Sequence, residues 1–125
     1  MDDNISSKFS EVENLYNTKK QLEALALLDD ILKIEPDNEM GLRNKGIISM
    51  NFRKYEQSIE LMDKLLENNP DDTEILCRKS VSLEMLGKHV ESLKYLDRVL
   101  KIEPDNEIAK NGLKCVNYLE NKENF

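Results

Sequence analysis

The chain has 125 residues, a formal net charge of −7, and 34% charged against 39% hydrophobic side chains. That length fits one domain, and the hydrophobic share favours a folded core over a disordered chain. The negative charge argues against a nucleic-acid partner, because neutralising phosphates requires a basic surface.

The sequence shows no signal-peptide pattern, no membrane-spanning segment and no cysteine motif for a disulfide framework or a zinc site. Residues 1–4 read MDDN, with acids where a signal peptide carries basic residues, and no apolar segment follows. The longest apolar run, 24–28, is far shorter than the roughly 20 residues that a membrane span needs. Cys77 and Cys115 lie far apart, without a CxxC motif and with a single histidine, so neither a disulfide framework nor a zinc site is expected. We expect a soluble, cytoplasmic protein with no membrane partner, metal or cofactor.

The first part of the chain predicts two helices separated by the polar segment 17–20. Apolar residues recur at helical spacing on both sides of this segment. They are Phe9, Val12 and Tyr16 before it, and Ala24, Leu28, Ile31 and Leu32 after it.

A nine-residue stretch that recurs along the chain sets its repeat period. Residues 31–39 (ILKIEPDNE) return at 99–107 with eight of nine positions identical, and a weaker copy lies at 65–72. The three prolines, Pro36, Pro70 and Pro104, are therefore 34 residues apart. A fixed period of this size predicts stacked, repeated supersecondary units.

Each proline marks a turn between two helices. The residue before a proline is pushed away from helical geometry, so helices are expected to end near Glu35, Asn69 and Glu103. The Asp and Asn residues after each proline can accept hydrogen bonds from the free N–H groups of the next helix. Acids just beyond them suit the positive end of its dipole. Each copy therefore predicts one helix ending and an antiparallel one starting within about four residues.

The second and third units repeat one pattern of two helices, with a small residue where each helix crosses its partner. The second unit has Leu42, Gly46, Ile47 and Met50, a polar break at 51–54, and then Tyr55, Ser58, Ile59, Met62, Leu65 and Leu66. The third has Leu76, Ser80 and Leu83, the break Gly87-Lys88, and then Ser92, Leu93, Leu96, Val99 and Leu100. A last amphipathic helix at 107–121 is expected to cap the array. A truncated fourth repeat is the alternative for this segment.

These units resemble the tetratricopeptide repeat (TPR), whose pattern runs from a large apolar residue through Leu-Gly, an aromatic and a small residue to a closing proline. The second and third units fit it well, and the first fits from Ala24 to Pro36 if one residue is deleted near 17–20. Lys45 and Lys79 stand where the family more often has leucine, and Asn44-Lys45-Gly46 resembles an "NKG" variant of archaeal and bacterial proteins. The resemblance implies an all-α, right-handed helical-hairpin solenoid. Its repeats would span about 5–38, 39–72 and 73–106, followed by the capping helix.

The resemblance also implies a concave groove lined by the first helix of each unit, in which a peptide or helix of a partner protein docks. The expected groove residues are Met40, Arg43, Asn44, Ile47, Met50 and Asn51 from the second unit, Cys77, Arg78, Val81 and Met85 from the third, and Ile108, Asn111, Cys115 and Tyr118 from the cap. Methionines offer an adaptable apolar floor, while Arg and Asn can fix a carboxylate or a peptide backbone. The alternative is that Met40, Met50 and Met85 are core residues between adjacent helices.

Some family members are co-chaperones that bind the free C-terminus of heat-shock chaperones through a two-carboxylate clamp. Asn44 and Arg78 stand at matching positions, as does Asn14 if the one-residue deletion is correct. Ser10 and Glu74 replace the two lysines, and Glu74 would repel the carboxylate that the clamp must hold. The clamp is therefore a weaker interpretation than a general groove.

Nothing in the pattern assembles an active site, so an enzyme is not expected. The acids of the second helices, Glu60, Asp63, Glu91 and Asp97, are expected on the outer face, where no partner selects a general acid. His89 is expected to be a packing or surface histidine. We therefore predict a protein–protein interaction module, with self-assembly or scaffolding through the terminal faces, and thus a homo-oligomer, as the alternative.

Overall fold

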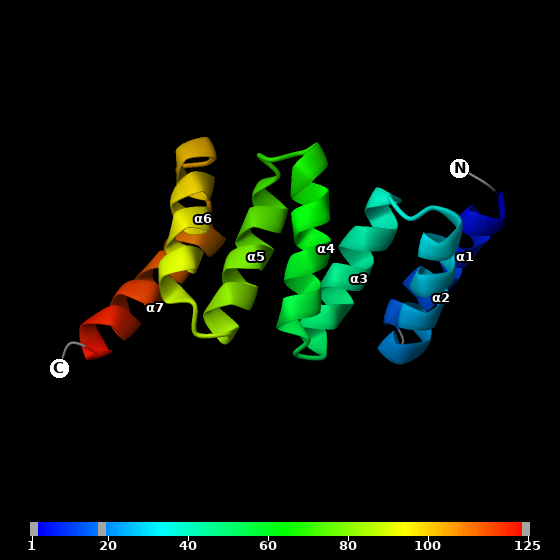
Figure 1. Cartoon of the computed structure of the whole chain (residues 1–125), viewed down its shortest axis with the longest axis horizontal. Helices are drawn as coiled ribbons and strands as arrows, with labels where there is room; N and C mark the ends of the chain where they lie inside the picture. Colours follow the sequence, from blue (N-terminus) through cyan, green and yellow to red (C-terminus); the bar gives the residue numbers. More distant parts are fainter. Residues whose placement is uncertain (1–2, 18–19, 124–125) are drawn as a thin grey trace.

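The computed structural model describes residues 3–17 and 20–123, with side chains for 4–15 and 20–115. Figure 1 shows its helices side by side in one row, from α1 and α2 at one end to α6 and α7 at the other. They are α1 (Asp3–Asn17), α2 (Gln21–Ile34), α3 (Glu39–Asn51), α4 (Tyr55–Asn68), α5 (Thr73–Met85), α6 (His89–Ile102) and α7 (Glu107–Glu123). These seven helices, with no strand in the described residues, confirm the all-α helical-hairpin solenoid. None of the helices within these ranges is long and apolar enough to cross a membrane.

The turns form where the prolines predict them. Helices α2, α4 and α6 end at the caps Glu35, Asn69 and Glu103. The next helices are capped by Asn38, Asp72 and Asn106, whose side-chain oxygens accept hydrogen bonds from backbone N–H groups at 2.9, 3.2 and 2.9 Å, respectively. Each of these caps contributes about 1 kcal/mol. The proposed deletion falls on 17–20, where residues 18 and 19 lie outside the described residues, and α7 ends two residues beyond the predicted 121.

Each antiparallel helix pair has its own small core, which the following helix closes. The α1/α2 core includes Ile48 of α3, the α3/α4 core includes Ile75 of α5, and the α5/α6 core includes Ala109 of α7. Because every pair depends mainly on its neighbour, the array is quasi-one-dimensional, as expected for a solenoid.

Small residues lie where paired helices cross, as predicted. Ser58 Oγ donates to the carbonyl of Gly46 at 2.8 Å, and Ser92 Oγ donates to the carbonyl of Ser80 at 3.1 Å. These bonds satisfy buried hydroxyl groups while the two helices approach closely.

The two lysines that depart from the repeat pattern tie neighbouring pairs together. Lys45 Nζ lies 2.7 Å from Asp29 of α2, and Lys79 Nζ lies 2.5 Å from Asp63 of α4. Lys79 also donates to the Tyr95 hydroxyl at 2.7 Å and sits 4.3 Å from the centre of that ring. Asp63 is half-exposed, as its predicted outer position requires, but it has a specific partner.

Candidate functional site

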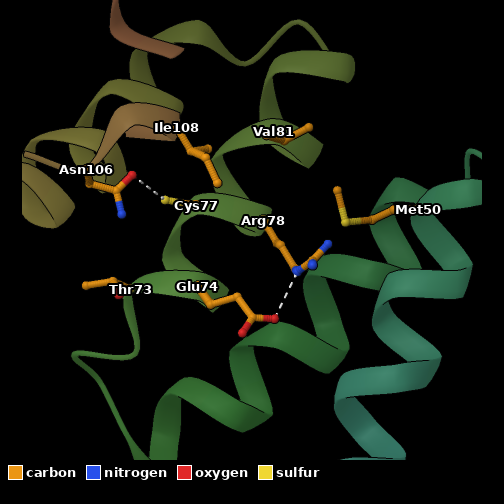
Figure 2. Close-up of a pocket in the computed structure, with 8 residues that line it drawn as sticks. All are labelled: Met50, Thr73, Glu74, Cys77, Arg78, Val81, Asn106 and Ile108. Carbon is orange, nitrogen blue, oxygen red and sulfur yellow. Dashed lines mark hydrogen bonds and ion pairs between the residues drawn. The ribbon is translucent and has the colours of Figure 1, made fainter. Parts of the chain in front are cut away.

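A cavity of about 390 Å³ opens between α3, α5 and the start of α7 (Figure 2). Its wall is one face of α5, built from residues spaced three or four apart, which lie above one another on a helix. The lining residues are Thr73, Glu74, Cys77, Arg78 and Val81 of α5, Met50 of α3, Asn106 of the preceding turn and Ile108 of α7.

The apolar part of the cavity is contributed by three different helices. Met50, Val81 and Ile108 surround it in Figure 2, and Val81 and Ile108 are 42% and 62% exposed, respectively. Such exposure of large apolar side chains around one hollow is typical of a surface that binds another apolar group.

Polar residues gather at the end of the cavity nearest the start of α5. Glu74 stands between two arginines: Arg78 Nε donates to its carboxylate at 3.2 Å, and Arg43 Nη1 lies 3.3 Å from it. Arg43 is further held by Asp72 at 2.7 Å and Glu39 at 3.4 Å. Burial lowers the pKa of Arg43, but these hydrogen bonds and charges outweigh it and raise the pKa overall. Arg43 is thus a tie between α3 and α5, whereas Arg78 has one partner.

The opposite edge of the cavity carries a second polar cluster. Thr73 Oγ1 and Asn106 Nδ2 each donate to Glu103 at 2.8 Å, and these two bonds lower the pKa of its carboxyl. Cys77 Sγ makes a long contact of 3.9 Å with Asn106 Oδ1. Burial, followed by the negative charge of Glu103, raises the pKa of Cys77, so the thiol is not activated as a nucleophile.

Four of the ten predicted groove residues in the second and third units line the cavity: Met50, Cys77, Arg78 and Val81. Asn44 and Ile47 are half-buried, and Asn44 makes no side-chain hydrogen bond within the described ranges. Met40 and Met85 are 52% and 59% exposed, so neither is a core residue between helices. Asn51 is exposed and donates to Gln21 at 3.2 Å, which places it at the edge facing α2.

From the last helix, Ile108 lines the cavity, whereas Asn111 and Cys115 are exposed and do not line it. The side chain of Tyr118 lies outside the described residues. Sequence reasoning missed Thr73, although it precedes Cys77 by one helical turn on the same face.

No group of three or more metal-ligating side chains that could hold an ion occurs within the ranges described above. Cys77 and Cys115 are both free, the first buried and the second exposed. His89 pairs with Glu84 at 3.0 Å near the turn before α6 and does not line the cavity.

No protein-family model and no curated protein matches the sequence. Solved structures of TPR domains are similar to the chain over most of their length. The first TPR of Spaghetti (RPAP3), bound to the HSP90 peptide SRMEEVD, has a TM-score of 0.83 at 20% identity, covering 92% of this chain and 91% of that one. The Sgt2 TPR domain from Aspergillus fumigatus has 0.83 at 16%, covering 98% and 83%. The second TPR domain of human RPAP3, in complex with the HSP70 peptide SGPTIEEVD, has 0.79 at 18%, covering 89% and 92%. These similarities show a TPR-like fold.

Proposed function

We propose that the chain is a protein–protein interaction module that holds a short segment of a partner protein in the groove between α3, α5 and α7. The observation that carries this proposal is the open cavity with half-buried Met50 and exposed Val81 and Ile108 at its rim. The repeats are taken to span 5–38, 39–72 and 73–106, and the groove lies between helices of the second and third repeats and α7. Two TPR domains of similar fold are bound to peptides, which supports a peptide-binding role for this surface.

An apolar side chain of the partner is the expected anchor. Its full burial stabilises a complex by about 1.5–3 kcal/mol, and a cavity of about 390 Å³ has room for one such side chain. The amide of Asn44 and the free part of the Arg78 guanidinium can then pair with the partner's backbone carbonyls, which fixes its direction.

A two-carboxylate clamp of the co-chaperone kind is not favoured for this chain. The carboxylate of Glu74 already pairs with both Arg43 and Arg78. A ligand carboxylate would have to displace it and then remain beside a like charge, which is destabilising.

Selection of a random twelve-residue peptide library against the immobilised protein, followed by titration of the recovered peptide, tests the proposal. We expect Asn44→Ala with Arg78→Ala to weaken binding about tenfold, a loss of roughly one or two hydrogen bonds. Helicity and melting temperature should stay nearly unchanged, because neither side chain is in the core. If the double substitution unfolds the protein, or leaves the affinity intact, the groove assignment is wrong.

Self-assembly through the terminal faces is the alternative, and sedimentation of the isolated chain distinguishes the two. A monomer across the concentration range supports the groove. A fraction of dimer that increases with protein concentration, and that a substitution in α1 abolishes, supports self-assembly.

A further inference from the structure

The rim of the cavity, with the polar clusters at both of its edges, carries more negative than positive groups. Its two guanidinium groups belong to Arg43 and Arg78, and both are engaged by carboxylates of this chain. Its four carboxylates are Glu39, Asp72, Glu74 and Glu103. Three of them pair with these arginines, which leaves Glu103.

Glu103 is held by neutral donors alone. It accepts from Thr73 Oγ1 and Asn106 Nδ2, and no lysine or arginine among the described side chains, 4–15 and 20–115, forms an ion pair with it. Thr73 and Asn106 both line the cavity, so the carboxylate lies at the cavity's edge and is open to solvent. Hydrogen bonds from neutral groups favour the charged form without cancelling its charge.

The equivalent turns show that this arrangement is particular to the cavity. Glu35 accepts from Asn38 at 2.7 Å in the first turn, but no threonine adds a second bond there. In the middle turn the equivalent position is Asn69, which carries no charge. The negative charge with two donors therefore occurs beside the hollow between α5 and α7.

We propose that the groove selects a partner segment in which an apolar side chain has a lysine or arginine within a few residues. The apolar side chain occupies the cavity formed by Met50, Val81 and Ile108, and the cation pairs with Glu103. This inference rests on the proposed peptide-binding function and assigns the chemistry of its ligand. It makes Glu103 a specificity-determining residue rather than a part of the turn alone.

The expected size of the preference follows from the exposure of Glu103. An exposed ion pair changes affinity by a small factor, about threefold to fivefold, and salt reduces it. The apolar contact supplies affinity, while the charge decides which segments bind.

The test compares peptides recovered from a random dodecapeptide phage library by the wild type, Glu103→Gln and Glu35→Gln. Glutamine keeps an acceptor oxygen for the asparagine and removes the charge. Glu35→Gln is the matched control, because Glu35 makes the same bond to its asparagine but lies in the first turn, away from the cavity. A chosen peptide is then titrated, together with versions whose basic residue is Gln or Glu, at low and high salt.

We expect wild type and Glu35→Gln to enrich apolar residues next to Lys or Arg, and Glu103→Gln to enrich apolar residues without the basic bias. The titrations should show about threefold to fivefold weaker binding for the Gln peptide only when Glu103 is present, with the difference shrinking in high salt. Apolar peptides without a basic bias, or with acidic neighbours, would overturn the specificity while leaving the groove intact. If no peptide is enriched by any of the three proteins, the groove itself is refuted.

Discussion

The helix pairs α3/α4 and α5/α6 share a backbone plan but differ at the surface they present to the next pair. Arg43 and Cys77 occupy equivalent positions, 34 residues apart. Arg43 reaches across to the cap residue Asp72 at 2.7 Å, whereas Cys77 makes only a 3.9 Å contact with the equivalent cap Asn106. The junction between α3 and the start of α5 is filled by ion pairs, whereas the equivalent junction between α5 and the start of α7 is hollow.

The difference teaches that the fold supplies the positions of these side chains and not their role. A long arginine opposite an aspartate closes one junction, while a small thiol opposite an asparagine leaves room for a ligand. The same contrast recurs in the core, where Ile48 and Ser82 are equivalent and both fully buried, but the hydroxyl of Ser82 has no partner.

Converting the hollow junction into the filled one has the largest expected effect. In Cys77→Arg with Asn106→Asp, the new guanidinium should occupy the cavity and pair with the new carboxylate. Peptide binding should weaken by about 1.5–3 kcal/mol, the value of one lost apolar anchor, as measured by titration of a selected peptide. Circular dichroism and thermal melting establish that the variant is folded. Arg43→Cys with Asp72→Asn, which alters the other junction, serves as the control and should retain binding. If Cys77→Arg with Asn106→Asp folds and still binds the peptide normally, the hollow junction is not the ligand site.

Removing the two caps measures how differently the junctions are held. Asp72→Ala loses the bond to Ile75 N and the ion pair to Arg43, so it should lower the free energy of unfolding by about 2 kcal/mol. Asn106→Ala loses the bond to Ala109 N and should cost about 1 kcal/mol. Urea titration gives both values. Equal costs would mean that the Arg43 pair adds no stability.

The ion pairs Lys79–Asp63 and Lys45–Asp29 offer a third contrast, in which stability depends on pH. Burial lowers the pKa of Lys79, but the hydrogen bonds that its ammonium donates to Asp63 and Tyr95 outweigh burial and raise the pKa above its ordinary value. A raised lysine pKa stabilises the fold fully below the unfolded value and is lost as pH rises through the folded one. Asp63→Asn should lower the free energy of unfolding by about 1.5 kcal/mol, because it leaves a buried cation without its carboxylate. Asp29→Asn should lower it by about 0.5 kcal/mol, because its partner Lys45 is more exposed.

Urea titrations at neutral and strongly alkaline pH check this contrast. The wild type should lose stability on going to alkaline pH, and Asp63→Asn should lose less, because its Lys79 no longer has a carboxylate that favours the charged form. A pH dependence that is the same in both proteins would show that the pair does not stabilise the fold.

The smallest expected effect is a gain. Ser82→Ala removes a buried hydroxyl that has no partner and adds a better helix former, so it should raise the free energy of unfolding by about 0.5 kcal/mol. Ile48→Ala, at the equivalent position, should instead cost about 3 kcal/mol by leaving a void. A loss of stability in Ser82→Ala would indicate that the hydroxyl has a partner after all.

Local signals explain why the helices and turns could be predicted from the sequence. Asn38, Asp72 and Asn106 cap helices that begin at the next residue, so a proline followed by Asp and then by Asn or Asp is sufficient to place them. The groove face followed from the resemblance, and the structure places Met50, Arg78 and Val81 of that face around one cavity. The state of Arg43 could not be predicted, because its partner Asp72 is 29 residues away and depends on how two helix pairs stack. The position of Glu103 beside the cavity could not be predicted for the same reason, because its hydrogen bond with Thr73 forms only when the helix pairs stack.

Methyl NMR with a selected peptide tests the central claim most directly. Titration should shift the methyl signals of Met50, Val81 and Ile108, and leave that of Leu22, an exposed apolar residue of α2 outside the cavity, in place. Val81→Asp should abolish these shifts, while Leu22→Asp should not. Shifts centred on Leu22, or binding that survives in Val81→Asp, would contradict a ligand site between α3, α5 and α7.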